Sequence, residues 1–403
     1  MKTVCVVGLG YIGLPTALML ASHGNRVKAV DYNKELVDKL QRGEVTFEEK
    51  GLPELFDAAR SNIEFLHDYP DADVYIVAVP TPYLADSKKV DAVYVCGAVE
   101  NVLEACHDGS IVVVESTISP GTIDRHVRPV VEGSGRHVEL AHAPERIIPG
   151  NMVYELTHNS RTIGADKSEV GEVVRSIYGS FCQGEIVLTD IRTAEMSKVV
   201  ENTFRDINIA FANELMKICR SDGMDVYEII RIANKHPRVN ILQPGPGVGG
   251  HCISVDPWFL VGDYPELSKL ISTARHINDE QPAFVLERIH EIMEEKGLTD
   301  VNRVGLYGLT YKENVDDIRE SPTLQLLECQ AKHLAEPLKV YDPYVQKDLV
   351  KNQYHDLDKF LADVDLVVVM VGHDEIKENL SKLTGKVVLD TRNVCGGIER
   401  YTL

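Results

Sequence analysis

Short apolar runs alternate with amphipathic stretches along the first half of the chain. The runs rich in β-branched residues cover 3–7, 26–31, 72–79 and 110–115. Continuous apolar runs of this length are typical of parallel strands that are buried on both faces of a sheet. The pattern predicts a doubly wound α/β domain, in which helices cover both faces of a parallel sheet.

The middle of the chain has a helical period. Residues 193–220 lack the helix breakers Gly and Pro, and their apolar side chains recur every three or four positions: Met196, Val199, Val200, Phe204, Ile207, Phe211, Leu215 and Ile218. This spacing predicts one long helix that connects two domains. Its apolar stripe is expected to be either core or a dimer seam, and a second helix is expected over 281–296.

The strand pattern returns towards the C-terminus, at 303–307, 338–342, 365–371 and 386–390. Segment 364–371 echoes segment 72–79, which indicates shared architecture. The predicted fold class is therefore α/β, with two Rossmann-like doubly wound parallel-sheet domains joined by a long central helix and a helical middle domain. The expected boundaries are 1–190, 191–298 and 299–403.

Composition narrows the classes of function. A net charge of -20 over 403 residues argues against nucleic-acid binding, which requires a clustered positive face. The eight cysteines form no C-x-x-C pair, so neither a zinc ribbon nor a disulfide framework is expected. No segment is long and apolar enough to predict a membrane span. A cytoplasmic protein with reduced thiols is the expectation.

A glycine-rich turn follows the first predicted strand: Gly8-Leu9-Gly10-Tyr11-Ile12-Gly13. In a dinucleotide-binding turn, glycines at the first, third and sixth positions permit the tight turn, the approach of a pyrophosphate and close helix packing. Asp31 ends the next strand, where an acid holds ribose hydroxyls, and no arginine follows it directly, which favours NAD over NADP. The alternative is that these glycines merely make a strand-to-helix turn.

Hydroxyl side chains follow two later strands at the same predicted edge of the sheet. Thr81 lies between two prolines, and Ser116 and Thr117 follow the strand at 110–115. Two interpretations stay open on spacing alone. The hydroxyls line the cofactor cleft, or they serve ordinary turn chemistry.

A second glycine-rich segment, residues 245–252, ends in a cysteine. Cys252 lies four residues before Asp256, and a thiol presented on such a loop can attack a carbonyl carbon. On composition alone a cysteine is more often a buried structural residue. His251, Cys252 and Asp256 have no complementary ligand cluster elsewhere, so no metal site is expected.

Three further polar residues are candidates by position. Lys198 and Asn202 lie four residues apart on the long predicted helix and share one face, for which a solvated charged face is the default interpretation. Glu145, in Ala143-Pro144-Glu145-Arg146, follows the run that ends the first α/β domain and is a candidate base.

These motifs together closely resemble the UDP-glucose/GDP-mannose dehydrogenase family over nearly the full chain. The segments that carry the resemblance are 6–15, 195–202, 249–252 with Asp256, and Tyr311-Lys312 running to 317–321. Within the family, residues 247–259 look most like members that oxidise UDP-N-acetyl-D-mannosamine. The resemblance implies an NAD-binding domain over 1–190, a central dimerisation domain with the cysteine loop over 191–298, and a UDP-sugar-binding domain over 299–403.

The resemblance also implies catalytic roles for the candidates. Cys252 matches the nucleophile, Lys198 and Asn202 match residues that stabilise oxyanions, and Asp256 matches an acid that supports proton transfer through water. Glu145 matches the acid of thioester hydrolysis. The glucose-specific members have a second glutamate four residues on, where this chain has Pro149, so the hydrolytic step is expected to be organised differently.

Binding roles follow in the same way. Lys312 and Gly249 match substrate-binding positions, and Lys198 and Asn202 also contact substrate in the family. Arg238 resembles an arginine that reaches the substrate of a neighbouring subunit, although its spacing to Cys252 differs. Arg319 matches an arginine near the cofactor phosphates. Together with the residues singled out above, the expected cofactor-binding residues are Gly8, Gly10, Tyr11, Ile12, Gly13, Asp31, Thr81, Thr117 and Arg319.

The reaction that the resemblance implies is a four-electron oxidation of the C6 alcohol of a UDP-sugar to a carboxylate. Two NAD molecules accept hydride in turn, and a Cys252 thiohemiacetal and thioester connect the two steps. UDP-N-acetyl-D-mannosamine is the expected substrate, with UDP-N-acetylglucosamine and UDP-glucose as alternatives, and a homodimer is expected. Rival classes are a two-electron hydroxy-acid dehydrogenase and a regulatory protein that binds NAD without turnover.

Overall fold

The computed structural model describes residues 2–250, 252–332 and 337–403. The chain forms two compact units. The N-terminal unit comprises residues 1–201 and 262–264, and the C-terminal unit comprises residues 202–261 and 265–403. Across the described residues, no helix has both the length and the apolar character that crossing a membrane demands.

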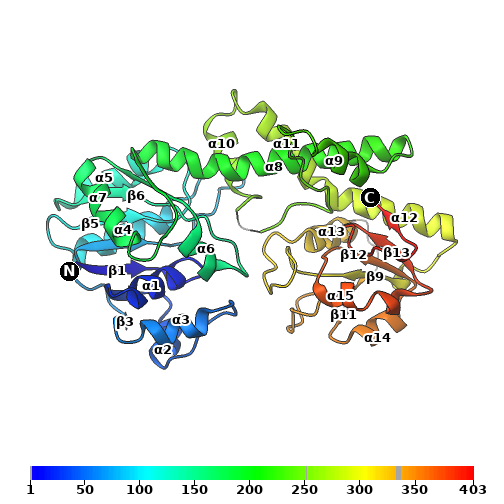
Figure 1. The fold of residues 1–403 in the computed structure, drawn as a ribbon, viewed down its shortest axis with the longest axis horizontal. Coiled ribbons are helices and arrows are strands. Elements are labelled where there is room, and N and C mark those ends of the chain that lie inside the picture. Colours follow the sequence, from blue (N-terminus) through cyan, green and yellow to red (C-terminus); the bar gives the residue numbers. More distant parts are fainter. Residues whose placement is uncertain (1, 251, 333–336) are drawn as a thin grey trace. The chain divides into compact units, whose positions relative to one another are not determined.

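The N-terminal unit contains one eight-stranded sheet in the order β3-β2-β1-β4-β5-β6-β7-β8 (Figure 1). Its strands are β1 Thr3–Val7, β2 Arg26–Val30, β3 Ile63–Leu66, β4 Val74–Val77, β5 Ile111–Val114, β6 Glu139–His142, β7 Arg161–Ala165 and β8 Ile186–Thr189. The four predicted strands are confirmed as parallel neighbours, whereas β6 pairs antiparallel with β7. The strand order reverses between β1 and β4, which is where such sheets bind ligands.

Helices cover both faces of this sheet. They are α1 Gly13–Ser22, α2 Lys34–Gln41, α3 Leu52–Ala59, α4 Val93–Ala105, the π-turn η1 Ile123–Val127, α5 Arg128–Ser134, α6 Met152–His158 and α7 Ser168–Tyr178. Successive side chains of a strand point to opposite faces. Val4 and Val6 of β1 accordingly join the core beneath α1, and Cys5 and Val7 join the core beneath α4.

The long helix α8, Ile191–Ser221, confirms the prediction made from its period. Of the two expectations for its apolar stripe, core and dimer seam, the core is only partly confirmed. Val199 is fully buried, but Val200, Phe204, Phe211 and Ile218 are 46%, 64%, 53% and 53% exposed. Polar side chains of α8 are buried beside apolar ones. The buried polar residues are Glu195, Lys198, Asn202, Thr203, Asp206 and Asn213, and the buried apolar residues include Ala194, Val199, Ala212, Met216 and Cys219.

The C-terminal unit has a six-stranded parallel sheet in the order β11-β10-β9-β12-β13-β14. The strands are β9 Val304–Tyr307, β10 Lys339–Tyr341, β11 Gln353–Tyr354, β12 Leu366–Val369, β13 Val387–Asp390 and β14 Tyr401–Thr402. This order repeats that of the first six strands of the N-terminal unit, so two doubly wound sheets are confirmed.

Helices precede and flank this second sheet (Figure 1). They are α9 Val226–Ala233, α10 Asp256–Asp263, α11 Lys269–Asp279, α12 Gln281–Lys296, α13 Pro322–Ala331, α14 Leu357–Ala362 and α15 Asp374–Glu378, with the 3-10 turns η2 Val301–Arg303 and η3 Leu380–Leu383. Helix α12 has the predicted bounds. It packs on the sheet through Val285, Ile289 and Ile292, which are almost fully buried.

A glycine in β7 fixes how α8 begins. A Cβ added to Gly164 would lie 2.6 Å from Ile191 Cα and 2.7 Å from Asp190 O. We therefore expect Gly164→Ala to reduce the free energy of unfolding by about 1–3 kcal/mol, because backbone cannot move aside as a side-chain end can. Gly97→Ala on α4 is the control. A Cβ there has open space, and alanine should raise the free energy by about 0.5–1 kcal/mol. Urea denaturation of both variants tests this, and equal effects would contradict it.

Candidate active site

The glycine turn after β1 has the geometry of a dinucleotide-binding turn. Gly8 has φ +91°, and a Cβ added there would lie 2.4 Å from the carbonyl oxygen of Ala78. A Cβ on Gly13 would lie 1.8 Å from the carbonyl oxygen of Gly8. A Cβ on Gly10 would have nothing within 4 Å. The backbone is therefore tight at Gly8 and Gly13 and open at Gly10, as approach by a pyrophosphate requires.

Asp31 locks this turn to the end of β2. Its Oδ2 accepts the N–H of Leu9 at 2.7 Å, and its Oδ1 accepts the N–H of Asn33 at 2.8 Å. Helix α1 begins after Ile12, whose apolar side chain cannot cap it, so its first N–H groups can face an anion. The residues present thus fit the adenosine and pyrophosphate of a dinucleotide.

The predicted hydroxyls at the carboxyl edge of the sheet bond to backbone. Thr81 Oγ1 donates to the carbonyl oxygen of Thr117 at 2.7 Å, and Ser116 Oγ donates to that of Val79 at 2.7 Å. These bonds join the loops after β4 and β5. The hydroxyl protons of Thr81 and Ser116 are therefore used in turn hydrogen bonds. Their hydroxyl oxygens can still accept hydrogen bonds from a cofactor.

Glu145 is buried, and its Oε2 accepts the N–H of Ile147 at 2.5 Å. Behind it lies a buried ion pair between Arg161 and Glu115, with Nη1 2.7 Å from Oε1, and Arg161 also donates to the carbonyl oxygen of Ala143 at 3.3 Å. Burial raises the pKa of Glu115 even though Arg161 opposes the shift. Charge is thus packed beneath the strand end that carries Glu145.

Two acids that the sequence did not single out hold the loop after Glu145. Glu49 accepts the N–H groups of Gly150 at 2.7 Å and Met152 at 2.9 Å, and Glu155 accepts that of Ile148 at 2.7 Å. Pro149, which has no N–H to offer, lies between these anchors. Glu49 is about a hundred residues away along the chain, so no local pattern could have identified it.

Lys198 and Asn202 are 6% and 5% exposed, so they do not form a solvated charged face. Asn202 Nδ2 donates to Asp256 Oδ2 at 2.6 Å within the C-terminal unit. This bond links the middle of α8 to the first residue of α10. An amide and a carboxylate that the sequence separates widely are thereby brought together.

Glu195, one turn before Lys198, anchors the loop between β5 and η1. Its carboxylate accepts the N–H of Ile123 at 2.9 Å and also that of Gly121. Burial raises the pKa of Glu195 to about 7, although the two backbone bonds favour the charged form. The sequence placed Glu195 in a family motif without assigning it this role.

The cysteine loop places Cys252 at the surface of the C-terminal unit. Of the eight cysteines, all in the described part of the chain, Cys252 alone is exposed. Its carbonyl oxygen accepts the N–H groups of Val255 at 3.1 Å and Asp256 at 2.9 Å, which turns the chain into α10. The structural interpretation of Cys252 as a buried residue is therefore wrong.

Glycines bring the cysteine loop against residues 311–320. A Cβ on Gly249 would lie 2.5 Å from the carbonyl oxygen of Glu320, and one on Gly250 would lie 2.8 Å from the ring of Tyr311. The N–H of Gly250 donates to the carbonyl oxygen of Arg319 at 2.9 Å. Only glycine fits at either position without moving this neighbouring loop.

The charges around the thiol are mixed. Burial, the charge of Asp317 and the nearby thiol of Cys252 raise the pKa of Tyr311 to about 12. Burial opposes the charged form of Arg319, but its hydrogen bonds to Asp317 and the proximity of Cys252 raise the pKa of the guanidinium. A cation near a thiol favours the thiolate, which is the nucleophilic form.

The predicted residues therefore fall into two groups. The N-terminal unit carries the glycine turn, Glu145 and Lys198, and the C-terminal unit carries Asn202, Asp256, Cys252 and the 311–320 loop. Arg238 is exposed after α9. His251 lies outside the described residues, and among the described ones no group of His, Cys, Asp and Glu has the arrangement of a metal site.

Comparison with known families agrees with this chemistry. The NAD binding domain of the UDP-glucose/GDP-mannose dehydrogenase family matches residues 2–182, its central domain matches 192–280, and its UDP binding domain matches 305–397. The chain belongs to the UDP-glucose/GDP-mannose dehydrogenase family. It is accordingly an NAD-dependent oxidoreductase. The boundaries expected at 190/191 and 298/299 stay predictions.

Three relatives are informative about substrate. A UDP-N-acetyl-D-mannosamine dehydrogenase from Methanococcus maripaludis is 43% identical over 98% of this chain and 93% of its own length. An NDP-N-acetyl-D-galactosaminuronic acid dehydrogenase from Ralstonia nicotianae is 39% identical over 98% and 96%. The structure of the UDP-N-acetyl-mannosamine dehydrogenase Cap5O from Staphylococcus aureus matches with TM-score 0.88 and 43% identity over 99% of this chain and 98% of that one.

The raised pKa of Glu195 predicts how stability depends on pH. With a pKa of about 7, Glu195 in the folded protein is expected to keep its proton to a higher pH than an unfolded glutamate, whose ordinary pKa is 4.5. The contribution of Glu195 to the free energy of unfolding is fully present below the pKa of the unfolded state. It is lost as the pH rises through the pKa of the folded state, and the loss is roughly 3 kcal/mol at most. Glu195→Gln removes the titration.

We therefore expect the free energy of unfolding of wild type to fall relative to that of Glu195→Gln between about pH 5 and pH 8. Urea denaturation of both proteins across this range measures the difference. A difference that stays constant with pH would show that Glu195 is ionised throughout.

Proposed function

We propose that this dehydrogenase oxidises the C6 alcohol of UDP-N-acetyl-D-mannosamine to the carboxylate of UDP-N-acetyl-D-mannosaminuronate. The observation that carries the proposal is the exposed Cys252, which ends a glycine loop packed on the loop of Lys312 and Arg319. An aldehyde dehydrogenation of this kind requires a thiol that a substrate can reach. The names of the most similar relatives support an N-acetylamino sugar.

Bound NAD would accept one hydride in each of the two oxidations. The chain supplies the remaining chemistry. The Cys252 thiolate adds to the aldehyde carbon to give a thiohemiacetal, whose oxidation leaves a thioester. Water then cleaves the C–S bond and releases the carboxylate and the thiol.

The polar residues have distinct tasks in this scheme. The ammonium of Lys198 and the amide of Asn202 stabilise negative charge on the reacting oxygen. Asp256, which accepts a hydrogen bond from Asn202 at 2.6 Å, both orients that amide and takes up a proton through water. We assign Glu145 to the hydrolysis of the thioester, since Pro149 leaves it without the second glutamate of the glucose-specific members.

Substrate binding in an acidic chain requires local cations. We assign the diphosphate to Lys312, with Gly249 giving close approach of backbone and Arg238 reaching the site of a neighbouring subunit. We assign the cofactor to the turn Gly8, Gly10, Tyr11, Ile12 and Gly13 with Asp31, Thr81, Thr117 and Arg319. None of the eight cysteines, all in the described part of the chain, forms a disulfide, which fits our placement of the reaction in the reducing cytoplasm.

The stoichiometry of NADH tests the chemistry. Wild type should release two NADH per UDP-N-acetyl-D-mannosamine and be less active on UDP-N-acetylglucosamine and UDP-glucose. Cys252→Ala should reduce the rate at least about a thousandfold, because a covalent nucleophile is lost. Cys329→Ala, which changes a half-buried cysteine of the same unit, is the control and should keep the wild-type rate.

One NADH per sugar with an active Cys252→Ala enzyme would overturn the covalent scheme in favour of a two-electron dehydrogenase. If the protein bound NAD but turned over none of the three UDP-sugars, the result would support the regulatory interpretation. A preference for UDP-N-acetylglucosamine or UDP-glucose would overturn the substrate assignment and leave the covalent scheme in place.

We further propose that the enzyme is a homodimer whose two copies meet along α8. Val200, Phe204, Phe211 and Ile218 are about half exposed and recur at helical spacing, and one more copy of the same stripe would cover them. The chemistry of the patch is apolar, which suits a permanent interface.

Phe211→Asp should shift the protein from dimer to monomer, because a charge placed in an apolar interface loses its hydration. Sedimentation velocity measures this. Val187→Asp, on an exposed apolar residue of β8 that is not part of the α8 stripe, is the control and should leave the mass unchanged. A dimer that survives Phe211→Asp would place the interface elsewhere.

A further inference from the structure

The two sheets contain the same turn after their first strand. Gly8 and Gly308 both have left-handed backbones, with φ +91° and +99°. Each donates its N–H to the last residue of the second strand, at 2.9 Å and 2.8 Å. Asp31 and Asp342 then accept the next N–H, from Leu9 at 2.7 Å and from Leu309 at 2.6 Å. The C-terminal unit thus repeats the turn that serves a dinucleotide in the N-terminal unit.

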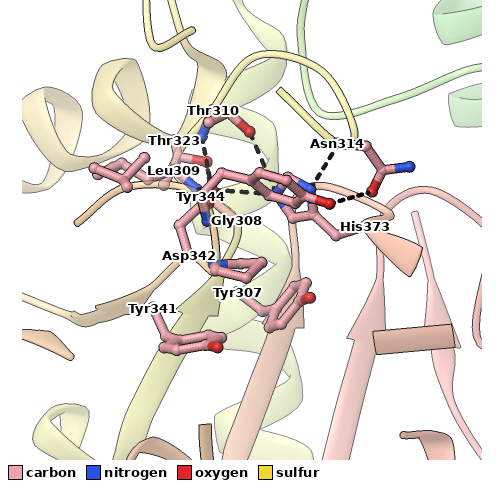
Figure 2. Close-up of polar contacts among 12 residues, drawn as sticks. Tyr307, Gly308, Leu309, Thr310, Asn314, Thr323, Tyr341, Asp342, Tyr344 and His373 are labelled. Carbon is pink, nitrogen blue, oxygen red and sulfur yellow. Dashed lines mark hydrogen bonds and ion pairs between the residues drawn. The ribbon is translucent and has the colours of Figure 1, made fainter. Parts of the chain in front are cut away.

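The third position of the turn differs. Gly10 leaves space above the N-terminal turn, whereas the equivalent residue of the C-terminal turn is Thr310, which is fully buried. A histidine, His373, follows β12 and is also fully buried beside Thr310 (Figure 2). The place where a Rossmann sheet binds phosphate is therefore filled by the chain's own side chains.

The hydrogen bonds of this cluster determine which ring nitrogen of His373 carries the proton. The N–H of Asn314 can only donate, so Nδ1 of His373 accepts it at 2.9 Å. The proton of the neutral ring then lies on Nε2, which is 3.2 Å from Asp342 Oδ2 and 3.3 Å from Thr310 Oγ1. Burial would raise the pKa of Asp342, but its bonds to His373 and to backbone N–H groups lower it.

These bonds enclose Lys312 from both sides. Thr310 Oγ1 accepts from His373 and donates to the carbonyl oxygen of Lys312 itself at 2.9 Å. Two residues later, Asn314 is held by His373 through its N–H. Its left-handed backbone, φ +59°, reverses the chain at this point.

Side-chain bonds secure Asn314 further. Asn314 Nδ2 donates to Asp374 Oδ2 at 2.9 Å, and Asn314 Oδ1 accepts the N–H of Asp374 at 3.1 Å and the hydroxyl of Tyr344 at 3.3 Å. The Tyr344 ring lies 5.0 Å from that of His373 (Figure 2). The loops after β9, β10 and β12 therefore meet at His373.

We propose that the buried His373–Asp342 pair is a positioning device that sets the backbone of Lys312 for binding of the substrate's uridine diphosphate. The proposal rests on the proposed function, in which Lys312 contacts the diphosphate. A buried polar pair is often no better for stability than well-packed apolar side chains of similar volume. Its distinctive property is direction, because each ring nitrogen of His373 fixes a different side of the Lys312 turn.

Two variants of His373 separate the contributions of its two ring nitrogens to UDP binding. The side chain of asparagine places its oxygen where Nδ1 lies, so His373→Asn can keep the bond to Asn314 and loses the contact with Thr310 and Asp342. His373→Leu loses both. Calorimetric titration with UDP should show weaker binding in the order wild type, His373→Asn and His373→Leu, with about a tenfold loss for the last. With UDP-N-acetyl-D-mannosamine, KM should rise while kcat stays within about twofold.

Coupling to Lys312 distinguishes positioning from general destabilisation. In a Lys312→Met background, replacing His373 should no longer weaken UDP binding, because the contact it positions has been removed. Val388→Ala, a cavity in β13 of the same unit, is the control. It should lower Tm as the His373 variants do and leave the Kd of UDP unchanged.

Wild-type affinity for UDP in both His373 variants would overturn the proposal, as would a loss of the same size with and without Lys312. The proposal would also be overturned if Val388→Ala lost UDP affinity in proportion to its fall in Tm, because reduced stability alone would then account for weaker binding. Wild type that binds UDP but forms no NADH from UDP-sugars would overturn the proposed reaction and leave the positioning result standing.

Discussion

The close approach of a carboxylate to the first strand-to-helix turn organises both halves of this protein. Asp31 and Asp342 each directly follow the second strand of a sheet and accept N–H groups from the turn that follows the first strand. The turn can form only because glycine occupies the left-handed position, at Gly8 and at Gly308. Each anchored turn lies next to the point where the strand order reverses, between β1 and β4 and between β9 and β12.

The turn after the first strand differs between the two sheets at its third position. In the N-terminal unit, Gly10 keeps the turn open, so that a pyrophosphate and the start of α1 can meet. In the C-terminal unit, Thr310 and His373 fill the equivalent space, and the loop beyond carries Tyr311, Lys312 and Arg319. That loop also receives the glycines of the cysteine segment. One architecture thus has an open turn in one copy and, in the other, a turn whose equivalent space is filled by side chains.

Helix α8 has an unusual distribution of polar and apolar residues, because several of its polar side chains are buried and several of its apolar ones are exposed. Its buried side chains include Lys198, Asn202 and Asp206, and its exposed ones include Phe204 and Phe211. Burying polar groups is costly unless each finds a partner. Asn202 binds Asp256, and Asp206 binds Arg275, so tertiary contacts offset that cost. The buried face of α8 is therefore mixed, with paired polar side chains beside apolar ones such as Val199, Ala212 and Met216.

The sequence by itself determined the elements whose signal is local. Apolar runs located β1, β2, β4, β5 and the main strands of the second sheet, helical periodicity located α8 and α12, and the glycine spacing with Asp31 predicted the dinucleotide turn. The two-residue strands β11 and β14 and the strands β3, β6, β7 and β8 were not predicted, because their pairing partners rather than their own composition define them. Only tertiary structure decided which face of α8 is buried, that Cys252 is exposed, and that Glu49, Glu195 and His373 anchor functional loops. Those outcomes depend on partners tens to a hundred residues away, and hydrogen bonds over such separations leave no periodic trace in the chain.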